Sequence, residues 1–207
     1  MGDHLVYSPE PAHWGRLFSL REAISEAVQD ATILKSGKFV MSSTMPKTKQ
    51  ETSLDLPFRH TLATLAYRAA KPLRDVPQGF SEVSAGKGSR SAGEILAHLC
   101  DLMDWALSIA RGKEVWQDTK PKSWSEDRER FFTALEALDS HIASGQKLHA
   151  SCESIFQGAI ADALTHVGQI ALLRRLAEAP VRPENYSVAK IETGRVGAKQ
   201  NAPVAEF

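Results

Sequence analysis

Cysteine is scarce in this sequence: Cys100 and Cys152 are the only two, and neither belongs to a CxxC pair. Two isolated cysteines exclude a disulfide-stabilised framework and favour a reducing compartment. The sequence also begins without a basic segment leading into an apolar one, so it shows no secretory signal. We therefore expect a cytoplasmic protein.

The sequence also lacks an excess of positive or negative charge, and it lacks long apolar runs. The 25 lysines and arginines balance 25 aspartates and glutamates, which argues against non-specific nucleic-acid binding but leaves a local basic patch open. In the C-terminal half the longest uncharged stretch, 163–173, stops at Arg174. It is too short for a membrane-spanning helix, which needs about 20 apolar residues. We expect a globular protein with neither nucleic acid nor membrane among its partners.

The first part of the chain, residues 1–53, offers little to bury. One amphipathic helix is expected over 17–28, whereas 42–53 is a polar run typical of a linker. We expect 1–53 to be a partly disordered N-terminal appendage. A natural start of the protein at Met41 or Met45 is an open alternative.

Helical patterns begin at residue 54. Apolar residues recur at steps of three and four, the spacing of one helix face, and in the first helix they are Phe58, Leu62, Leu65 and Ala69. Pro72 is expected to end or kink this helix, because proline lacks the amide hydrogen and clashes with the preceding turn. A connection rich in glycine and serine follows at 79–89.

Two capping boxes predict the next two helices. Ser91 with Glu94 opens the second helix and Ser123 with Glu126 opens the third. Their apolar sides carry Ile95, Leu99, Leu102, Ala106 and Ile109, and then Phe131, Leu135, Leu138 and Ile142. Glycines at 112 and 145 are the natural stops of these helices.

A fourth helix is expected over 152–177, closed by the prolines at 180 and 183. Its inward side carries Ile155, Phe156, Ala159, Ala163, Val167 and Ile170. Nothing between 54 and 179 alternates with the period of a strand for long enough to form one. Amphipathic helices bury their apolar faces best against one another, so the expected fold is all-α, a four-helix bundle over 54–186.

Two further expectations concern the tail and the tryptophans. Residues 187–207 are expected to form a C-terminal tail, extended over the surface. Trp105, Trp116 and Trp124 are expected to pack in the core or at its rim, as large aromatic side chains usually do.

Two of the seven histidines have neighbours that suggest chemistry. His98 is expected on the inward side of the second helix and His166 beside the apolar stripe of the fourth. Asp162 precedes His166 by four residues, so the two point the same way, with Cβ atoms about 6 Å apart. With a histidine from a facing helix they would form a two-histidine, one-carboxylate metal site that keeps positions open. Solvated or helix-end positions are expected for His4, His13, His60, His141 and His149.

The spacing alone also admits a simpler interpretation. An aspartate and a histidine four residues apart are often only an ion pair on a helix surface. A single inward histidine is often no more than a hydrogen-bonded core residue.

Two segments resemble the DinB-like (DinB/YfiT-like) family. One is SAGEILAH, which ends at His98 and is followed by DLMDW from Asp101; the other is DALTHVGQ, which starts at Asp162 and is followed by LRRLA. The resemblance covers roughly 54–186. It implies a DinB-type four-helix bundle, usually a homodimer, with a divalent metal held by three side chains.

The resemblance also implies which residues hold the metal. His98 stands for the family's histidine on the second helix, and His166 for the second histidine of an HxxxH pair on the last long helix. Asp162 replaces the first histidine of that pair, and the related mycothiol-dependent maleylpyruvate isomerases look similar in using a carboxylate there. Its negative charge favours harder cations, and zinc, nickel and manganese are not distinguished.

Family members with known chemistry are largely metal-dependent enzymes that use low-molecular-weight thiols, as S-transferases or isomerases, and others are described as hydrolases. The resemblance therefore implies an enzyme that activates such a thiol or water for attack on a small electrophile. Asp101, one helical turn from His98, is the candidate catalytic residue, as an acceptor that orients a ligand imidazole or in proton transfer. A surface or end-of-bundle carboxylate is the alternative role for Asp101.

A different class of function also stays open, namely a non-catalytic, stress-related dimeric bundle with a structural or vestigial metal site. Arg174 and Arg175 would suit either an anionic substrate or the dipole at a helix C-terminus. Nothing in the sequence identifies the substrate or chooses between thiol and water as the nucleophile.

Overall fold

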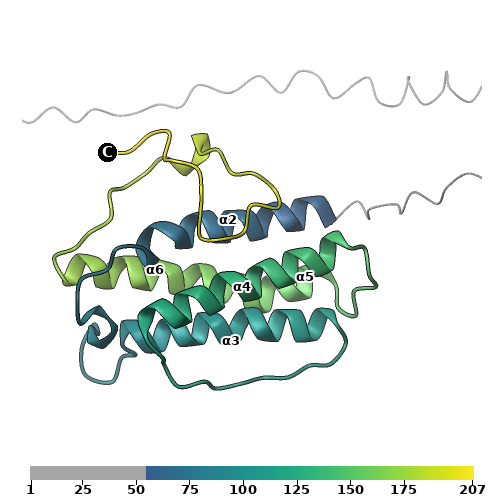
Figure 1. Ribbon diagram of the computed structural model, residues 1–207, viewed down its shortest axis with the longest axis horizontal. Helices are drawn as coiled ribbons and strands as arrows, with labels where there is room; N and C mark the ends of the chain where they lie inside the picture. The colour runs from purple at the N-terminus through teal and green to yellow at the C-terminus, as the bar shows by residue number, and fades with distance from the viewer. Residues whose placement is uncertain (1–54) are drawn as a thin grey trace, which may run out of the picture. The chain divides into compact units, whose positions relative to one another are not determined.

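The computed structural model describes residues 55–207, so the expected appendage 1–53 lies outside the described residues. Residues 55–207 are mainly helical, as predicted (Figure 1). These residues contain no strand, only two isolated antiparallel bridges. The all-α expectation is therefore confirmed for this part of the chain.

The first two long helices begin and end where the sequence predicts. Helix α2 spans Asp55–Leu73 and ends one residue after Pro72. A short 3₁₀ helix, η1 (Phe80–Glu82), lies in the following connection, and α3 spans Ala92–Ala110. Both halves of the capping box are present at the start of α3, where Ser91 and Glu94 each accept the other's backbone N–H.

The third long helix, α4, spans Trp124–Ala143 and also starts with a complete capping box. The expected fourth helix is present but not uniform. It consists of α5 (Cys152–Ile155), a π-helical segment η2 (Phe156–Ile160) and α6 (Ala161–Leu176). The π-helical segment adds a wider turn to the helix and ends two residues before Asp162.

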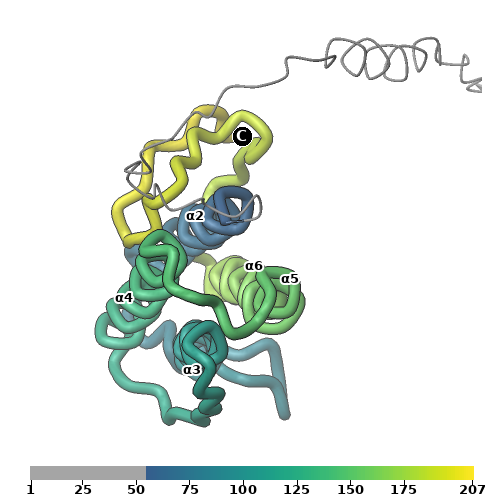
Figure 2. The backbone as a smooth tube through the Cα atoms, turned by 90° about the vertical axis from the view of Figure 1, so that its right-hand side faces the viewer, coloured from purple at the N-terminus to yellow at the C-terminus, as the bar shows by residue number. Residues whose placement is uncertain are grey.

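The four long helical segments pack side by side around one core. Helices α2 and α3 each contact both α4 and α6, and Figure 2 shows this arrangement end-on. Helices α3 and α4 run in the same direction (Figure 1). The segment that joins them, 111–123, therefore runs back along the bundle, and we call it the crossover.

The core is made largely of the predicted stripes. Nearly all of the expected inward residues are buried, among them Leu62, Leu99 and Leu135 at 0% exposure. Two expectations were wrong. Ile109, in the last turn of α3, is only half-buried, and Phe156 is 42% exposed. Phe156 is the first residue of the π-helical segment, where the regular step of an α-helix, on which the prediction relied, does not hold.

The C-terminal tail differs from the expected extended surface segment. It folds back over α2, and an antiparallel bridge joins Glu184 to Glu206. The Glu184 carboxylate accepts a hydrogen bond from the Tyr67 hydroxyl at 2.6 Å and pairs with Lys71 at 3.3 Å. Val196 is 3% exposed and belongs to the core. The tail is thus partly an element of the core.

None of the helices between residues 55 and 207 combines the length and the apolar character needed to cross a bilayer.

Candidate metal centre

Three of the predicted residues come together where α3 faces α6. Nε2 of His98 on α3 lies 3.3 Å from Oδ2 of Asp162 on α6, and the imidazole rings of His98 and His166 are 4.7 Å apart between centroids. One ligand atom from each of the three side chains lies within 4.8 Å of the other two. We call His98, Asp162 and His166 the triad; it is a group that could hold a metal ion.

Local sequence explains the position of each member. The capping box at Ser91 starts α3 so that His98 is on the side that faces α6. Asp162 and His166 are one helical turn apart on α6, and side chains at that spacing lie on the same face. The π-helical segment before Asp162 is a local departure of a kind that is frequent at functional sites.

Hydrogen bonding favours one tautomer of His166. Its Nδ1 lies 3.0 Å from the backbone carbonyl oxygen of Asp162 and 3.2 Å from that residue's Oδ1. A carbonyl oxygen can only accept, so Nδ1 carries the hydrogen and donates it. The lone pair of His166 is therefore on Nε2. Metal-binding histidines commonly hold their second nitrogen in this way.

The neutral form of His98 is favoured by its surroundings. Burial lowers the pKa of His98, and this effect outweighs the hydrogen bond to Asp162, which raises it; the charge of Arg90 lowers it further. A neutral imidazole keeps the lone pair that a metal requires. The side chain of Asp162 is 43% exposed, whereas those of the two histidines are 15% and 12% exposed. The triad is therefore open to solvent on the carboxylate side.

The three side chains offer ligand atoms that suit a divalent metal, and the spacing between these atoms is close to what one ion requires. Imidazole nitrogens suit zinc and nickel, and a carboxylate oxygen extends the range to manganese. Two ligands at about 2.1 Å from one ion are at most about 4.2 Å apart. Atoms at the 4.8 Å limit of the group would have to approach by about 0.6 Å, which a small side-chain rotation provides.

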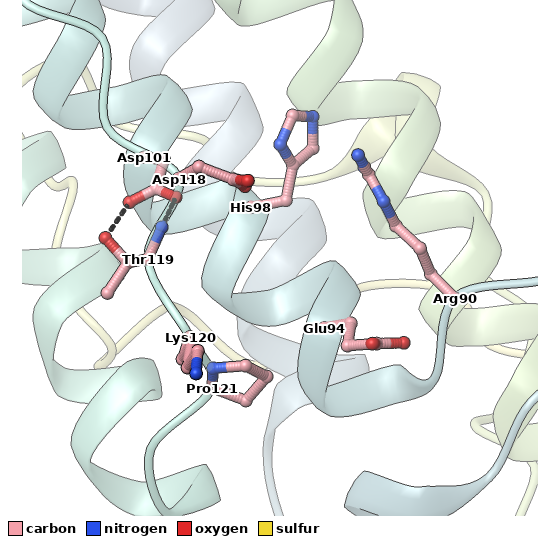
Figure 3. Close-up of a pocket in the computed structure, with 8 residues that line it drawn as sticks. All are labelled: Arg90, Glu94, His98, Asp101, Asp118, Thr119, Lys120 and Pro121. Carbon is pink, nitrogen blue, oxygen red and sulfur yellow. Dashed lines mark hydrogen bonds between the residues drawn. The ribbon is translucent and has the colours of Figure 1, made fainter.

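Asp101 has other partners than the triad. Its carboxylate accepts hydrogen bonds from the backbone N–H of Thr119 at 2.8 Å and from the Thr119 hydroxyl at 2.6 Å (Figure 3), and it pairs with Arg130 at 2.7 Å. It is 1% exposed. These contacts do not orient His98; they fasten the crossover to α3 and α4. Of the alternative role, a surface or end-of-bundle carboxylate, the surface position is wrong because Asp101 is buried.

A polar cavity of about 250 Å³ opens beside His98 (Figure 3). One wall comes from α3 and the residue before its cap, with Glu94, His98, Asp101 and Arg90. The other wall is the crossover between Asp118 and Pro121. Figure 3 shows the Arg90 side chain extending along the cavity toward His98. A small molecule in this cavity would contact His98, the member of the triad that lines it.

Some residues near the triad were not recognised from the sequence. Arg90 was not singled out, and Trp116 was expected in the core or at its rim. The Trp116 ring instead lies against His98 with 5.7 Å between ring centroids and is 48% exposed. A crossover without regular structure has no periodicity from which such a position could be predicted.

The paired arginines have separate roles. Arg174 is buried, and its guanidinium donates hydrogen bonds to the carbonyl oxygens of Pro72, Asp75 and Ala179. It is therefore part of the structure and not available for an anionic substrate. Arg175 is exposed.

Comparison with known proteins assigns neither a family nor a function to the chain. No family model, no curated protein and no solved structure matches the chain.

Proposed function

We propose that this chain is a DinB-like, divalent-metal-dependent enzyme that activates a low-molecular-weight thiol or water for attack on a small electrophile. The observation that carries the proposal is the convergence of His98, Asp162 and His166 from two helices on one point. The resemblance of the same residues to the family's metal ligands supports it independently. A DinB-type homodimer is part of the proposal.

The triad residues have distinct roles in this proposal. His98 and His166 would each offer one imidazole nitrogen, and Asp162 one carboxylate oxygen. The hydrogen bond from Nδ1 of His166 to the Asp162 carbonyl keeps the ring in the orientation that presents Nε2. A divalent ion held by three such ligands would lower the pKa of a thiol or water at an open position toward neutrality.

The polar cavity provides the place for the substrate. Its volume, about 250 Å³, suits a small molecule or one end of a larger one. Arg90 at its edge adds a positive charge for which no hydrogen bond or ion pair is seen among the described residues. This charge would help to hold a negatively charged substrate, or the negative charge that develops during the attack of a nucleophile.

The proposed dimer is supported by the resemblance and by apolar surface. Leu172 and Leu176 on α6 are 53% and 57% exposed. Size-exclusion chromatography with light scattering tests this part separately. A chain that stays monomeric at every concentration would rule out the dimer without affecting the metal site.

The test of the proposed function starts with metal content. The full chain, purified without chelator, is expected to hold about one divalent ion, the number for a single three-ligand site. His98→Ala should lose it without loss of helix content by circular dichroism. His60→Ala, at an exposed histidine of α2, is the matched control and should keep the ion.

Activity is then measured on the metal-loaded chain with low-molecular-weight thiols and small electrophiles. Turnover that disappears in His98→Ala and persists in His60→Ala supports the enzyme. No metal, even after zinc, nickel and manganese have been supplied, contradicts it. That result would leave the non-catalytic bundle as the better description.

A further inference from the structure

Two tryptophans form an aromatic surface next to the triad. The rings of Trp116 and Trp105 meet edge to face, with 5.8 Å between centroids and 87° between planes. Trp116 also meets the His98 imidazole edge to face at 5.7 Å. We call Trp105 and Trp116 the tryptophan pair.

Hydrogen bonds on both sides hold Trp116 in this place. Just before it, the backbone N–H of Val115 donates to the Ser108 hydroxyl of α3 at 3.0 Å. Three residues after it, Thr119 is bound by the buried carboxylate of Asp101, also on α3. The crossover is thus attached to α3 on both sides of Trp116. These bonds fix the backbone on both sides of the ring that meets His98 edge to face.

Trp105 is positioned just as closely. Its indole N–H donates to Oε1 of Glu114 at 3.2 Å. Next to it lies Gly158 of the π-helical segment, where a Cβ atom would be in van der Waals contact with the indole ring at 3.4 Å. The Trp105 ring therefore lies directly against the helical segment that precedes Asp162 and His166.

The packing leaves about half of the Trp116 side chain exposed to solvent. The side chain is held in place and touches His98 and Trp105, yet 48% of its surface is exposed. An ordered aromatic ring with an exposed apolar surface beside polar groups is typical of a small-molecule site. The adjoining cavity is lined by charged and polar side chains and Pro121, so the tryptophan pair supplies aromatic surface that the cavity itself lacks.

We propose that the tryptophan pair is a binding subsite for an aromatic ring of the substrate, joined directly or through one atom to the group that reacts at the triad. The link between the aryl ring and the reacting group must be this short because only 5.7 Å separates the centroids of the Trp116 and His98 rings. This proposal rests on the proposed metal-dependent function and narrows its substrate to aryl-bearing electrophiles.

Two hydroxamates test the subsite, because both chelate divalent metals and only one carries a ring. The zinc-loaded full chain is titrated with benzohydroxamate and with acetohydroxamate in a calorimeter. Benzohydroxamate is expected to bind about tenfold more tightly, the gain expected from an aromatic contact together with the apolar area it buries. Trp116→Ala should abolish this preference, so that the ratio of the two affinities falls to about one.

Two further variants separate the aromatic contact from a change in the crossover. Trp116→Phe keeps a ring and should keep most of the preference. Val115→Ala removes the neighbouring side chain, itself 53% exposed, and should keep all of it. Loss of the preference in Val115→Ala as well would contradict a specific role for Trp116.

The outcomes distinguish the two proposals. If zinc binds and the two hydroxamates bind equally, the aryl subsite is wrong while the metal site stands. If the preference persists in Trp116→Ala, the subsite is also wrong. If the chain retains no divalent metal after zinc, nickel and manganese have each been supplied, or if neither hydroxamate binds the metal-loaded chain, the proposed function fails and the aryl subsite fails with it.

Discussion

His98 and Asp162 are 64 residues apart in the chain, yet Nε2 of His98 lies 3.3 Å from Oδ2 of Asp162. This contact joins α3 to α6 directly beside the π-helical segment. With His166 one turn further along α6, it forms the donor set on which the proposed chemistry depends.

Loss of either ligand on α6 should weaken metal binding. Asp162→Ala and His166→Ala each remove one of three donors, and the expected loss of zinc affinity is at least about tenfold. Competition with a chromogenic chelator measures it. Gln169→Ala, at an exposed position of the same helix, is the control. Unchanged affinity in both ligand variants would exclude the triad as the site.

Asp101 should matter for stability and not for metal affinity. Its carboxylate is buried, pairs with Arg130 and accepts both hydrogen bonds from Thr119. Asp101→Ala leaves buried donors unsatisfied and should cost about 2–4 kcal/mol of unfolding free energy. Urea denaturation measures this, and zinc titration of the folded variant should give wild-type affinity.

The neighbouring carboxylate is the matched control for that change. Asp104 also pairs with Arg130 but its side chain is 37% exposed, so Asp104→Ala should cost less than about 1 kcal/mol. A large drop in zinc affinity in Asp101→Ala would instead favour the orienting role predicted from the sequence.

Arg174 should be a major contributor to stability. Its guanidinium joins the C-terminal ends of α2 and α6 through the carbonyl oxygens of Pro72, Asp75 and Ala179. Arg174→Ala leaves these acceptors without their donor and should lower the unfolding free energy by about 1–3 kcal/mol. The change should approach that of the core truncation Leu135→Ala, about 2–5 kcal/mol.

Its neighbour provides the comparison. Arg175 is exposed, and Arg175→Ala should change stability by no more than about 0.5 kcal/mol. Equal losses in the two variants, measured by urea denaturation, would show that the carbonyl contacts of Arg174 contribute little.

The two cysteines should differ in reactivity. Burial raises the pKa of the Cys100 thiol, which is completely buried. Burial and the nearby charges of Asp55 and Glu153 raise the pKa of Cys152, which is only half-buried. Since the thiolate is the reactive form, iodoacetamide at pH 8 should modify Cys152 slowly and Cys100 only after unfolding. Peptide mass spectrometry reads both sites, and rapid modification of Cys100 in the native protein would contradict its burial.

The C-terminal tail should contribute stability that depends on pH. A hydrogen bond from Lys71 lowers the pKa of the Glu206 carboxyl. A carboxyl whose folded pKa is depressed stabilises the fold above its ordinary pKa, and this contribution is lost as the pH falls through the folded value. Glu206→Gln should therefore be less stable than wild type at pH 7, and the difference should shrink in acid, as the pH falls below the ordinary glutamate value of about 4.3.

Urea denaturation at both pH values tests this expectation. Glu82→Gln, at an exposed carboxylate, is the control and should follow wild type throughout. A difference between Glu206→Gln and wild type that persists unchanged in acid would show that the carboxylate charge is not its cause.

The sequence alone determined most of the helices and most of the core. Apolar spacing and capping residues act within a few residues of one another, so the limits of α3 and α4 and the burial of Leu62, Leu99 and Leu135 could be predicted. The three members of the triad were also named from the sequence, because one pair is a local spacing on a helix and the third residue lies on another helix's inner face.

Only the tertiary structure decided how distant segments meet. The buried carboxylate of Asp101 binds the crossover, Trp116 lies edge to face against His98, and Val196 of the tail enters the core. These contacts join segments without periodicity to helices elsewhere in the chain, and no local pattern records them. The distance from His98 to Asp162 is likewise set by the packing of α3 against α6, because helix packing brings together side chains that the chain itself separates.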